Sequence, residues 1–281
     1  MSLQHRAKRG LSAGMIHTIL LSYTLLALWP IFLVIINSFK SRKAIFRDPL
    51  GLPDEKSFSL IGFEKVLINS DFLLYFSNSL IVTVTALVIS IVIGAMAAWA
   101  LSEYRFKGNT LLGLYLAIGI MIPIRLGSVS ILNLMVAMDL ANTLTALILV
   151  YIAQALPLII FILSEFMRQI PNDLKEAARC DGVSEYKIFF QIILPLSRPA
   201  LGTVAVFSMV PIWNDLWFPL ILAPGEETRT ITLGVQQFIG QYVTDWNSVL
   251  ASLTLAILPI LLLYLLFSRQ LIRGITAGAV K

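Results

Sequence analysis

The stretch "KEAARCDGVSEYKIFFQIILPLSRPA", residues 175–200, carries most of its charge at its start and lies between two long apolar segments. Pro171, just before it, suits the first turn of a helix, and Asp173 places negative charge near that helix's positive N-terminal end. Gly182 can adopt the left-handed conformation that ends a helix. The pattern therefore predicts a short polar helix over residues 172–181.

A second helix is expected directly after this one. Ser184 can cap its N-terminus, and Glu185 is favourable in its first turn. The helix is predicted to continue to Leu194, after which Pro195 and Pro199 cannot donate backbone hydrogen bonds and bend the chain. The stretch thus forms a helix–turn–helix hairpin.

The chain as a whole is far more apolar than a soluble protein. Its 281 residues are 58% apolar and only 13% charged, and its mean hydropathy is +0.85. A helix needs about 20 apolar residues to cross the hydrocarbon core of a bilayer. Six segments reach this length: residues 13–37, 72–101, 110–138, 143–166, 199–222 and 249–267. The predicted fold is all-α, a polytopic membrane protein with six transmembrane helices and a cytoplasmic hairpin.

Basic residues set the predicted orientation. Placing the N-terminus in the cytoplasm puts most of the 21 Lys and Arg residues on that side, as the positive-inside rule requires. Both termini are then cytoplasmic. The predicted domains are a tail over residues 1–12, a membrane domain over 13–268 that contains the hairpin 171–197, and a second tail over 269–281.

The first apolar segment follows basic residues, which is also typical of a signal peptide. The segment is too long for one, however, and "NSFKSRKA" after it lacks a small-residue cleavage pattern. We therefore expect a retained helix whose basic tail orients the protein and needs no nucleic-acid role.

The sequence lacks the residue patterns of common catalytic and metal sites. It has two histidines, no HExxH pattern and a single cysteine, Cys180, so it has neither a zinc-binding set nor a Cys–His nucleophile. The phosphate-binding pattern G-x-x-x-x-G-K-[ST] does not occur. We expect no catalytic residue, no metal site and no cofactor bound by this chain.

The first short helix carries a narrow ridge. Leu174, Ala177, Ala178 and Asp181 share one face at i, i+3, i+4 and i+7 spacing, and small side chains let a partner approach closely. The alternative is an amphipathic helix lying on lipid. That alternative explains the charge but not the fixed spacing of Gly182 and the Leu-Pro pair.

This spacing is specific. E-A-A at 176–178, glycine at 182 and I-x-L-P at 192–195 resemble the EAA loop of permease subunits in bacterial ABC importers. The stretches "AAWALSEYRFKG" at 97–108 and "GITAGAVK" at 274–281 resemble the MalG type of carbohydrate importer subunit, as do "WNDLWFPL" from 213 and "WNSVLA" from 246. The resemblance spans nearly all of residues 12–281.

The resemblance implies a permease subunit of an ATP-driven importer for a sugar, oligosaccharide or glycoside in the bacterial inner membrane. Its implied partners are a second MalF-like permease, two ATPase subunits that hold ATP and Mg, and an extracytoplasmic solute-binding protein. The EAA loop would sit in a cleft of an ATPase subunit. The implied ATPase contacts are Glu176, Ala177, Ala178, Asp181, Gly182, Leu194 and Pro195 in the loop, and Gly274, Thr276, Gly278 and Lys281 in the tail.

Polar residues inside membrane spans are costly and are expected to face a pathway or one another. The predicted pathway residues are Arg125, Asn133, Gln154, Trp213, Asn214, Asp215 and Trp217. Arg125 should face the pathway or a carboxylate, and in the pathway it would suit an anionic sugar derivative. The two tryptophans are equally typical of interfacial anchors, and Asn133 and Gln154 of bonds between helices.

Two long loops, residues 38–71 and 223–247, are predicted outside as docking surfaces for the binding protein. Two other functions remain open from the residues alone. An ion-coupled secondary transporter would more usually show inverted repeats and buried acids, and a membrane scaffold needs neither. Neither alternative predicts the E-A-A spacing.

Overall fold

The computed structural model describes residues 3–68, 70–239 and 244–279. These residues contain helices, turns and two isolated β-bridges but no β-strand, so the all-α prediction is confirmed for them. They form two compact units. One comprises described residues within 1–71 and 237–255, and the other those within 72–236 and 256–281.

The first unit contains α1 (Leu3–Ser38), α2 (Arg42–Arg47), α3 (Ile61–Leu67) and the start of α14 (Trp246–Ala279). The stretch Gly14–Ser38 of α1 is apolar and almost wholly exposed, as expected of a helix that contacts lipid. α3 and α14 meet closely at Gly62, where a Cβ atom would lie 2.4 Å from the carbonyl oxygen of Asn247. Only glycine permits this approach.

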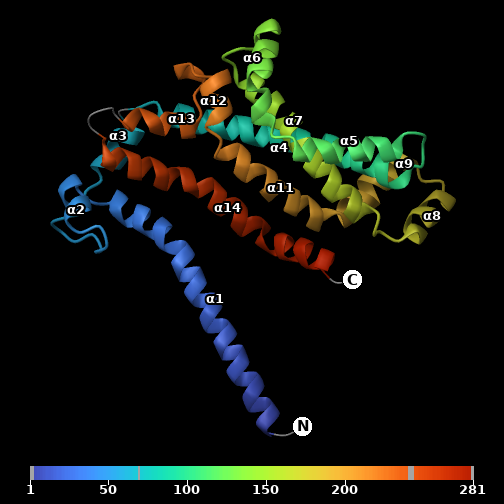
Figure 1. Cartoon of the computed structure of the whole chain (residues 1–281), viewed down its shortest axis with the longest axis horizontal. Coiled ribbons are helices and arrows are strands. Elements are labelled where there is room, and N and C mark those ends of the chain that lie inside the picture. The colour runs from blue at the N-terminus through green and yellow to red at the C-terminus, as the bar shows by residue number, and fades with distance from the viewer. Residues whose placement is uncertain (1–2, 69, 240–243, 280–281) are drawn as a thin grey trace. The chain divides into compact units, whose positions relative to one another are not determined.

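The second unit is built around α4 (Phe72–Glu103), α7 (Leu144–Met167) and α11 (Arg198–Trp213), which pack along one another (Figure 1). α4 and α7 are both apolar and long enough to span a membrane, close to the predicted bounds. Thr143 caps α7, its side chain accepting from Ala146 N at 3.2 Å. A Cβ at Gly94 would lie 2.5 Å from Ile159 Cγ2, so glycine sets the spacing of α4 and α7.

Shorter elements complete the second unit. They are α5 (Asn109–Met121), η1 (Ile124–Gly127), α6 (Ser128–Ala137), α8 (Asn172–Cys180), α9 (Glu185–Ile188), the π-turn η2 (Phe189–Ile193), α10 (Leu194–Leu196), α12 (Trp217–Leu222), η3 (Glu226–Thr228) and α13 (Ile231–Val235). The turn η4 (Gln236–Phe238) contains the point in the chain where the second unit ends and the first resumes, at residues 236 and 237.

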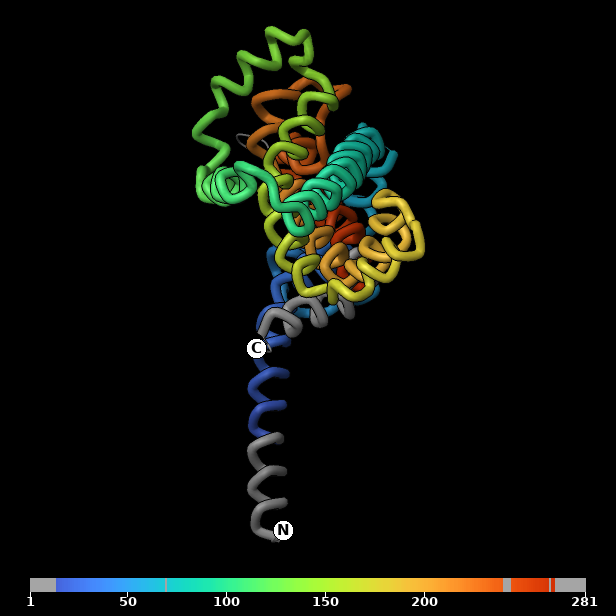
Figure 2. The backbone as a smooth tube through the Cα atoms, turned by 90° about the vertical axis from the view of Figure 1, so that its right-hand side faces the viewer, coloured from blue at the N-terminus to red at the C-terminus, as the bar shows by residue number. Residues whose placement is uncertain are grey.

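Two predicted spans are not continuous helices. The predicted span 110–138 is broken between α5 and α6, which meet at 85°, a turn visible in Figure 2. Ile122 is extended there because the following proline disfavours helical geometry in the residue before it. The predicted span 199–222 is likewise divided, since α11 ends at Trp213 and α12 begins at Trp217.

Three described helices are long and apolar enough to cross a membrane, and each of two bent pairs could supply one more span. The second pair joins residues 185–196 to 198–213 at 73°. α14 is one helix as far as Ala279, and its described apolar part, Trp246–Leu262, is shorter than the other spans. The count of six spans therefore stays a prediction.

Candidate functional site

The polar stretch contains two helices joined by a turn at residues 181–184. α8 ends in a Schellman motif, in which Gly182 has φ +74° and its N–H donates to Arg179 O at 3.0 Å. Val183 N donates to Ala178 O, also at 3.0 Å. These two bonds satisfy carbonyl groups that a helix end otherwise leaves unpaired. Gly182 is therefore required by backbone geometry.

The two sides of α8 differ. Leu174, Glu176, Ala177 and Asp181 are exposed, and no hydrogen bond or ion pair joins Glu176 to another described residue. Ala178 differs from the predicted ridge, because it is only 6% exposed and packs in the core beneath the helix. The exposed surface of α8 thus carries acidic side chains around the small side chain of Ala177, with Leu174 at one end.

The buried side of α8 holds a residue that the pattern did not single out. Lys175 is buried, and its Nζ donates to Glu103 Oε2 at the end of α4 at 2.6 Å. Both residues lie in charged stretches where the sequence offers many pairings, so no local signal selects this one.

The second helix of the hairpin changes its geometry before Pro195. α9 begins at Glu185 after Ser184, whose side chain makes no capping bond. It continues through the π-turn into α10, where Leu194 is half-buried against the core. The helix ends at Leu196, and α11 starts at an angle of 73° to it.

Arg125 and Asp215, both predicted pathway residues, lie together in the second unit. Arg125 Nη2 lies 3.2 Å from Asp215 Oδ1. Asp215 is buried and also accepts from Tyr151 OH at 3.0 Å and from the backbone N–H groups of Trp217 and Phe218 at 3.3 and 3.1 Å. Both oxygens of the carboxylate therefore accept hydrogen bonds, and two of these bonds hold the start of α12.

The guanidinium of Arg125 has hydrogen-bond donors to spare. Its side chain is 65% exposed and makes this one bond to a described side chain, so most of its five N–H donors are free. It lines a cleft of about 770 Å³ between α5 and α7, together with Gln154 and largely apolar side chains such as Tyr115 and Leu156. Two predicted pathway residues thus face the same opening.

The remaining predicted pathway residues lie elsewhere. Trp213 is buried, with its indole N–H donating to Ala256 O at 3.0 Å, so its ring is not accessible to a sugar in this structure. Trp217 is half-exposed and donates to Ser128 Oγ at 2.8 Å. Asn214 is exposed and bonds back to Val210 O in its own helix, and Asn133 is exposed on α6.

Tyr151 and Ser128 belong to the same cluster but were missed from the sequence. Tyr151 is 1% exposed and Ser128 is also buried. A hydroxyl inside an apolar span needs a partner, and that requirement was the available signal. It does not say which distant residue the partner is.

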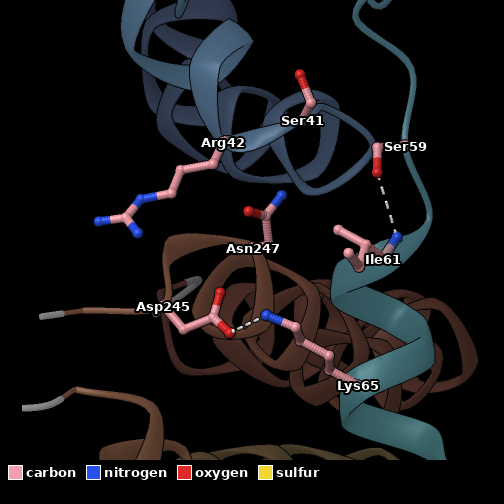
Figure 3. A pocket seen from close by; sticks show the side chains of 7 residues that line it. All are labelled: Ser41, Arg42, Ser59, Ile61, Lys65, Asp245 and Asn247. Atoms are coloured by element: carbon pink, nitrogen blue, oxygen red, sulfur yellow. Dashed lines mark hydrogen bonds and ion pairs between the residues drawn. The ribbon is translucent and has the colours of Figure 1, made fainter.

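A separate cleft of about 490 Å³ lies in the first unit (Figure 3). Its lining includes Arg42, Asn247 and an ion pair in which Lys65 Nζ lies 2.7 Å from Asp245 Oδ2. Burial alone would raise the pKa of Asp245, but hydrogen bonds from Lys65 and Ser248 hold it below its ordinary value. The cleft therefore keeps charges of both signs.

The predicted tail contacts are only partly described. The backbone of Gly274, Thr276 and Gly278 is helical within α14, and Lys281 lies outside the described residues. Within the described part of the chain, no group of three or more His, Cys, Asp or Glu residues is arranged to hold a metal ion.

Comparisons with known proteins agree with this architecture. The chain is 31% identical to the diacetylchitobiose uptake system permease protein NgcG of Streptomyces coelicolor, over 96% of this chain and 89% of that protein. It is also 31% identical to the arabinooligosaccharides transport system permease protein AraQ of Halalkalibacterium halodurans, over 91% and 92%.

A solved structure shares the fold. It is a chain of a bacterial ABC transporter involved in the import of the acidic polysaccharide alginate, which matches with a TM-score of 0.77 and 22% identity over 96% of this chain and 98% of that one. Residues 90–277 match the family model of the binding-protein-dependent transport system inner membrane component. The chain therefore belongs to the family of inner membrane components of binding-protein-dependent transport systems.

Proposed function

We propose that this chain is a permease subunit of an ATP-driven importer for a sugar, oligosaccharide or glycoside, and that it forms half of the translocation pathway. Its family membership and its long apolar helices support a membrane subunit. The relatives named for diacetylchitobiose and arabinooligosaccharides support a carbohydrate substrate.

The proposal includes a full topology. Six spans arise if the bent pair of residues 109–137 crosses once, α11 and α12 together cross as the predicted span 199–222, and α14 crosses over residues 249–267. Both termini then lie in the cytoplasm, the hairpin 171–197 lies on that same side, and the Lys65 cleft lies outside. The positive-inside distribution of Lys and Arg supports this orientation.

The exposed side of α8 carries the proposal. Glu176 and Asp181 flank Ala177 on a surface that has no partner among the described residues, in a helix closed by the Schellman turn at Gly182. A surface with acidic side chains around a small alanine side chain is complementary to a groove with basic walls. The groove would belong to a cytoplasmic ATPase subunit, which holds the ATP and Mg, because this chain has no phosphate-binding pattern.

The Arg125 cleft is the proposed sugar contact. Free guanidinium N–H groups and the Gln154 amide can bond sugar hydroxyls, and the apolar lining suits the C–H faces of a ring. The pairing of Arg125 with Asp215 makes the cluster formally neutral, so the cluster by itself does not favour an anionic sugar. The Lys65 cleft, with charges of both signs, is the proposed contact for the solute-binding protein.

Affinity purification from the native membrane tests the proposal. The wild-type chain should recover an ATPase, a second permease and a solute-binding protein, and Glu176→Lys should weaken recovery of the ATPase. Glu55→Lys is the matched control for recovery of the ATPase, since Glu55 is also an exposed glutamate but lies in the loop 38–71, which is predicted on the outer side. Recovery of no ATPase by the wild type would overturn the importer function and favour an ion-coupled transporter or a scaffold.

A further inference from the structure

A buried ion pair fastens α8 to the end of α4. Lys175 Nζ lies 2.6 Å from Glu103 Oε2, and the two side chains are only 6% and 10% exposed. A buried charge is costly without its partner, so breaking the pair from one side leaves the other charge stranded. Glu103 therefore holds Lys175, and with it the helix that carries Lys175.

Three further residues extend the pair into a network. Arg179 Nη2 lies 2.6 Å from Glu103 Oε1, and Arg179 Nε lies 2.7 Å from Glu185 Oε1. Tyr104 OH donates to Glu185 Oε2 at 2.9 Å. Each oxygen of Glu103 thus receives one cation, and two cations balance two anions. We call Glu103, Tyr104, Lys175, Arg179 and Glu185 the α8 network; it joins the end of α4, α8 and the start of α9.

An apolar layer lies beneath the network. Trp99 stands one turn before Glu103 on α4, with Lys175 Nζ 5.7 Å from its ring centroid. The ring also packs against Phe189 at 6.4 Å between centroids, in the same core as Ala178. Attraction of the ammonium to the ring face adds to the ion pair. The buried side of α8 is thus held by charge and by packing.

The two sides of α8 therefore have different tasks. The side with Glu176 is free for a partner, and the side with Lys175 is fixed to α4, which in turn packs closely along α7 at Gly94. We propose that Glu103 is a positioning residue that fixes α8 to α4, so that movement imposed on α8 is passed to the membrane helices. The identity of the partner that moves α8 rests on the proposed function; the attachment does not.

Hydrogen–deuterium exchange of residues 172–180 in the purified assembly in lipid nanodiscs tests the attachment. Glu103→Gln strands the Lys175 charge and should speed exchange there at least about tenfold. The double variant Glu103→Gln/Lys175→Met removes both charges at similar volume and should return exchange to within about threefold of the wild type. Arg179→Gln, which strands no buried cation, should have a smaller effect than Glu103→Gln.

The control is Glu165→Gln, which breaks an exposed glutamate–arginine pair with Arg168 and should leave exchange of α8 unchanged. Unchanged exchange in Glu103→Gln, or a double variant as fast as Glu103→Gln, would overturn the attachment. This readout needs no ATPase, so it decides the attachment even if the proposed function fails.

The transmission of movement has its own readout. The ratio of ATP hydrolysis with and without the co-purified binding protein and its substrate should fall at least about tenfold in Glu103→Gln and recover in the double variant. Faster exchange of α8 in Glu103→Gln together with an unchanged hydrolysis ratio would show that movement of α8 is not passed on through Glu103. That result would overturn the proposed transmission of movement.

Discussion

The hydroxyl of Tyr151 lies 3.0 Å from Oδ2 of Asp215, 64 residues along the chain, and both side chains are buried. This bond, with two backbone N–H groups of α12, fixes the carboxylate that faces Arg125. The start of α12 and the position of the guanidinium therefore depend on one buried carboxylate.

Tyr151→Phe should destabilise the protein by about 1.5–3 kcal/mol, because it removes a hydrogen bond to a buried charged group. The melting temperature in lipid nanodiscs measures this. Tyr115→Phe is the matched control, since Tyr115 is 72% exposed and makes no hydrogen bond to a described residue. Equal melting temperatures for the two variants would show that the Tyr151 bond contributes nothing.

Gly94→Ala should lower stability by about 1–3 kcal/mol, because the added methyl group meets Ile159 Cγ2 and forces α4 and α7 apart. Gly113→Ala, on α5, has no atom within 4 Å of the new methyl group and should be neutral or slightly stabilising. Thermal unfolding of both variants compares them directly. A neutral Gly94→Ala would mean that the two helices tolerate a wider spacing.

Arg125→Ala should reduce uptake of the true substrate about tenfold or more, since hydrogen bonds from a charged donor are lost. Arg125→Lys keeps the charge but loses the fork of donors, and should fall between the wild type and Arg125→Ala. Uptake by vesicles is measured at equal amounts of inserted protein. Wild-type uptake by Arg125→Ala would remove Arg125 from the pathway.

Low pH should weaken the Lys65–Asp245 pair. The pKa of Asp245 is lower in the folded protein than its ordinary value of 3.8, so the pair stabilises the fold above that value. This contribution is lost as the pH falls through the lower, folded value. The difference in stability between the wild type and Asp245→Asn should therefore stay constant from about pH 8 to pH 5 and shrink below about pH 4.

Thermal unfolding across this pH range provides the measurement. Asp71→Asn, at an exposed aspartate, is the matched control. A difference for Asp245→Asn that already shrinks near pH 6 would contradict a lowered pKa.

Local patterns predicted the backbone features well. Gly182 was expected in a left-handed conformation and has φ +74°, because the end of a helix imposes that requirement locally. The bounds of α4 and α7 follow from the length of their apolar runs. The break at Pro123 was not predicted, because proline is common in membrane helices and its position alone does not say how far it bends one.

Side-chain partners could be predicted only in part. Arg125 was expected to face a pathway or a carboxylate, and Asp215 was named independently, but nothing in the sequence joined them to Tyr151. From the sequence, Trp213 and Trp217 had the same two interpretations, pathway residue or interfacial anchor. Only their packing in the structure distinguishes the buried ring of Trp213 from the half-exposed ring of Trp217. Burial of this kind depends on which helices are neighbours.

The sequence by itself determined that the protein is an all-helical membrane subunit with a polar hairpin closed at Gly182, because apolar length and helix-end geometry act over a few residues. Only the tertiary structure decided which side of that hairpin is free. Lys175 and Glu176 are adjacent charged residues, yet one is buried against Glu103 and the other is exposed. A charge is buried where a partner from another helix meets it, and that partner lies 72 residues away in the chain.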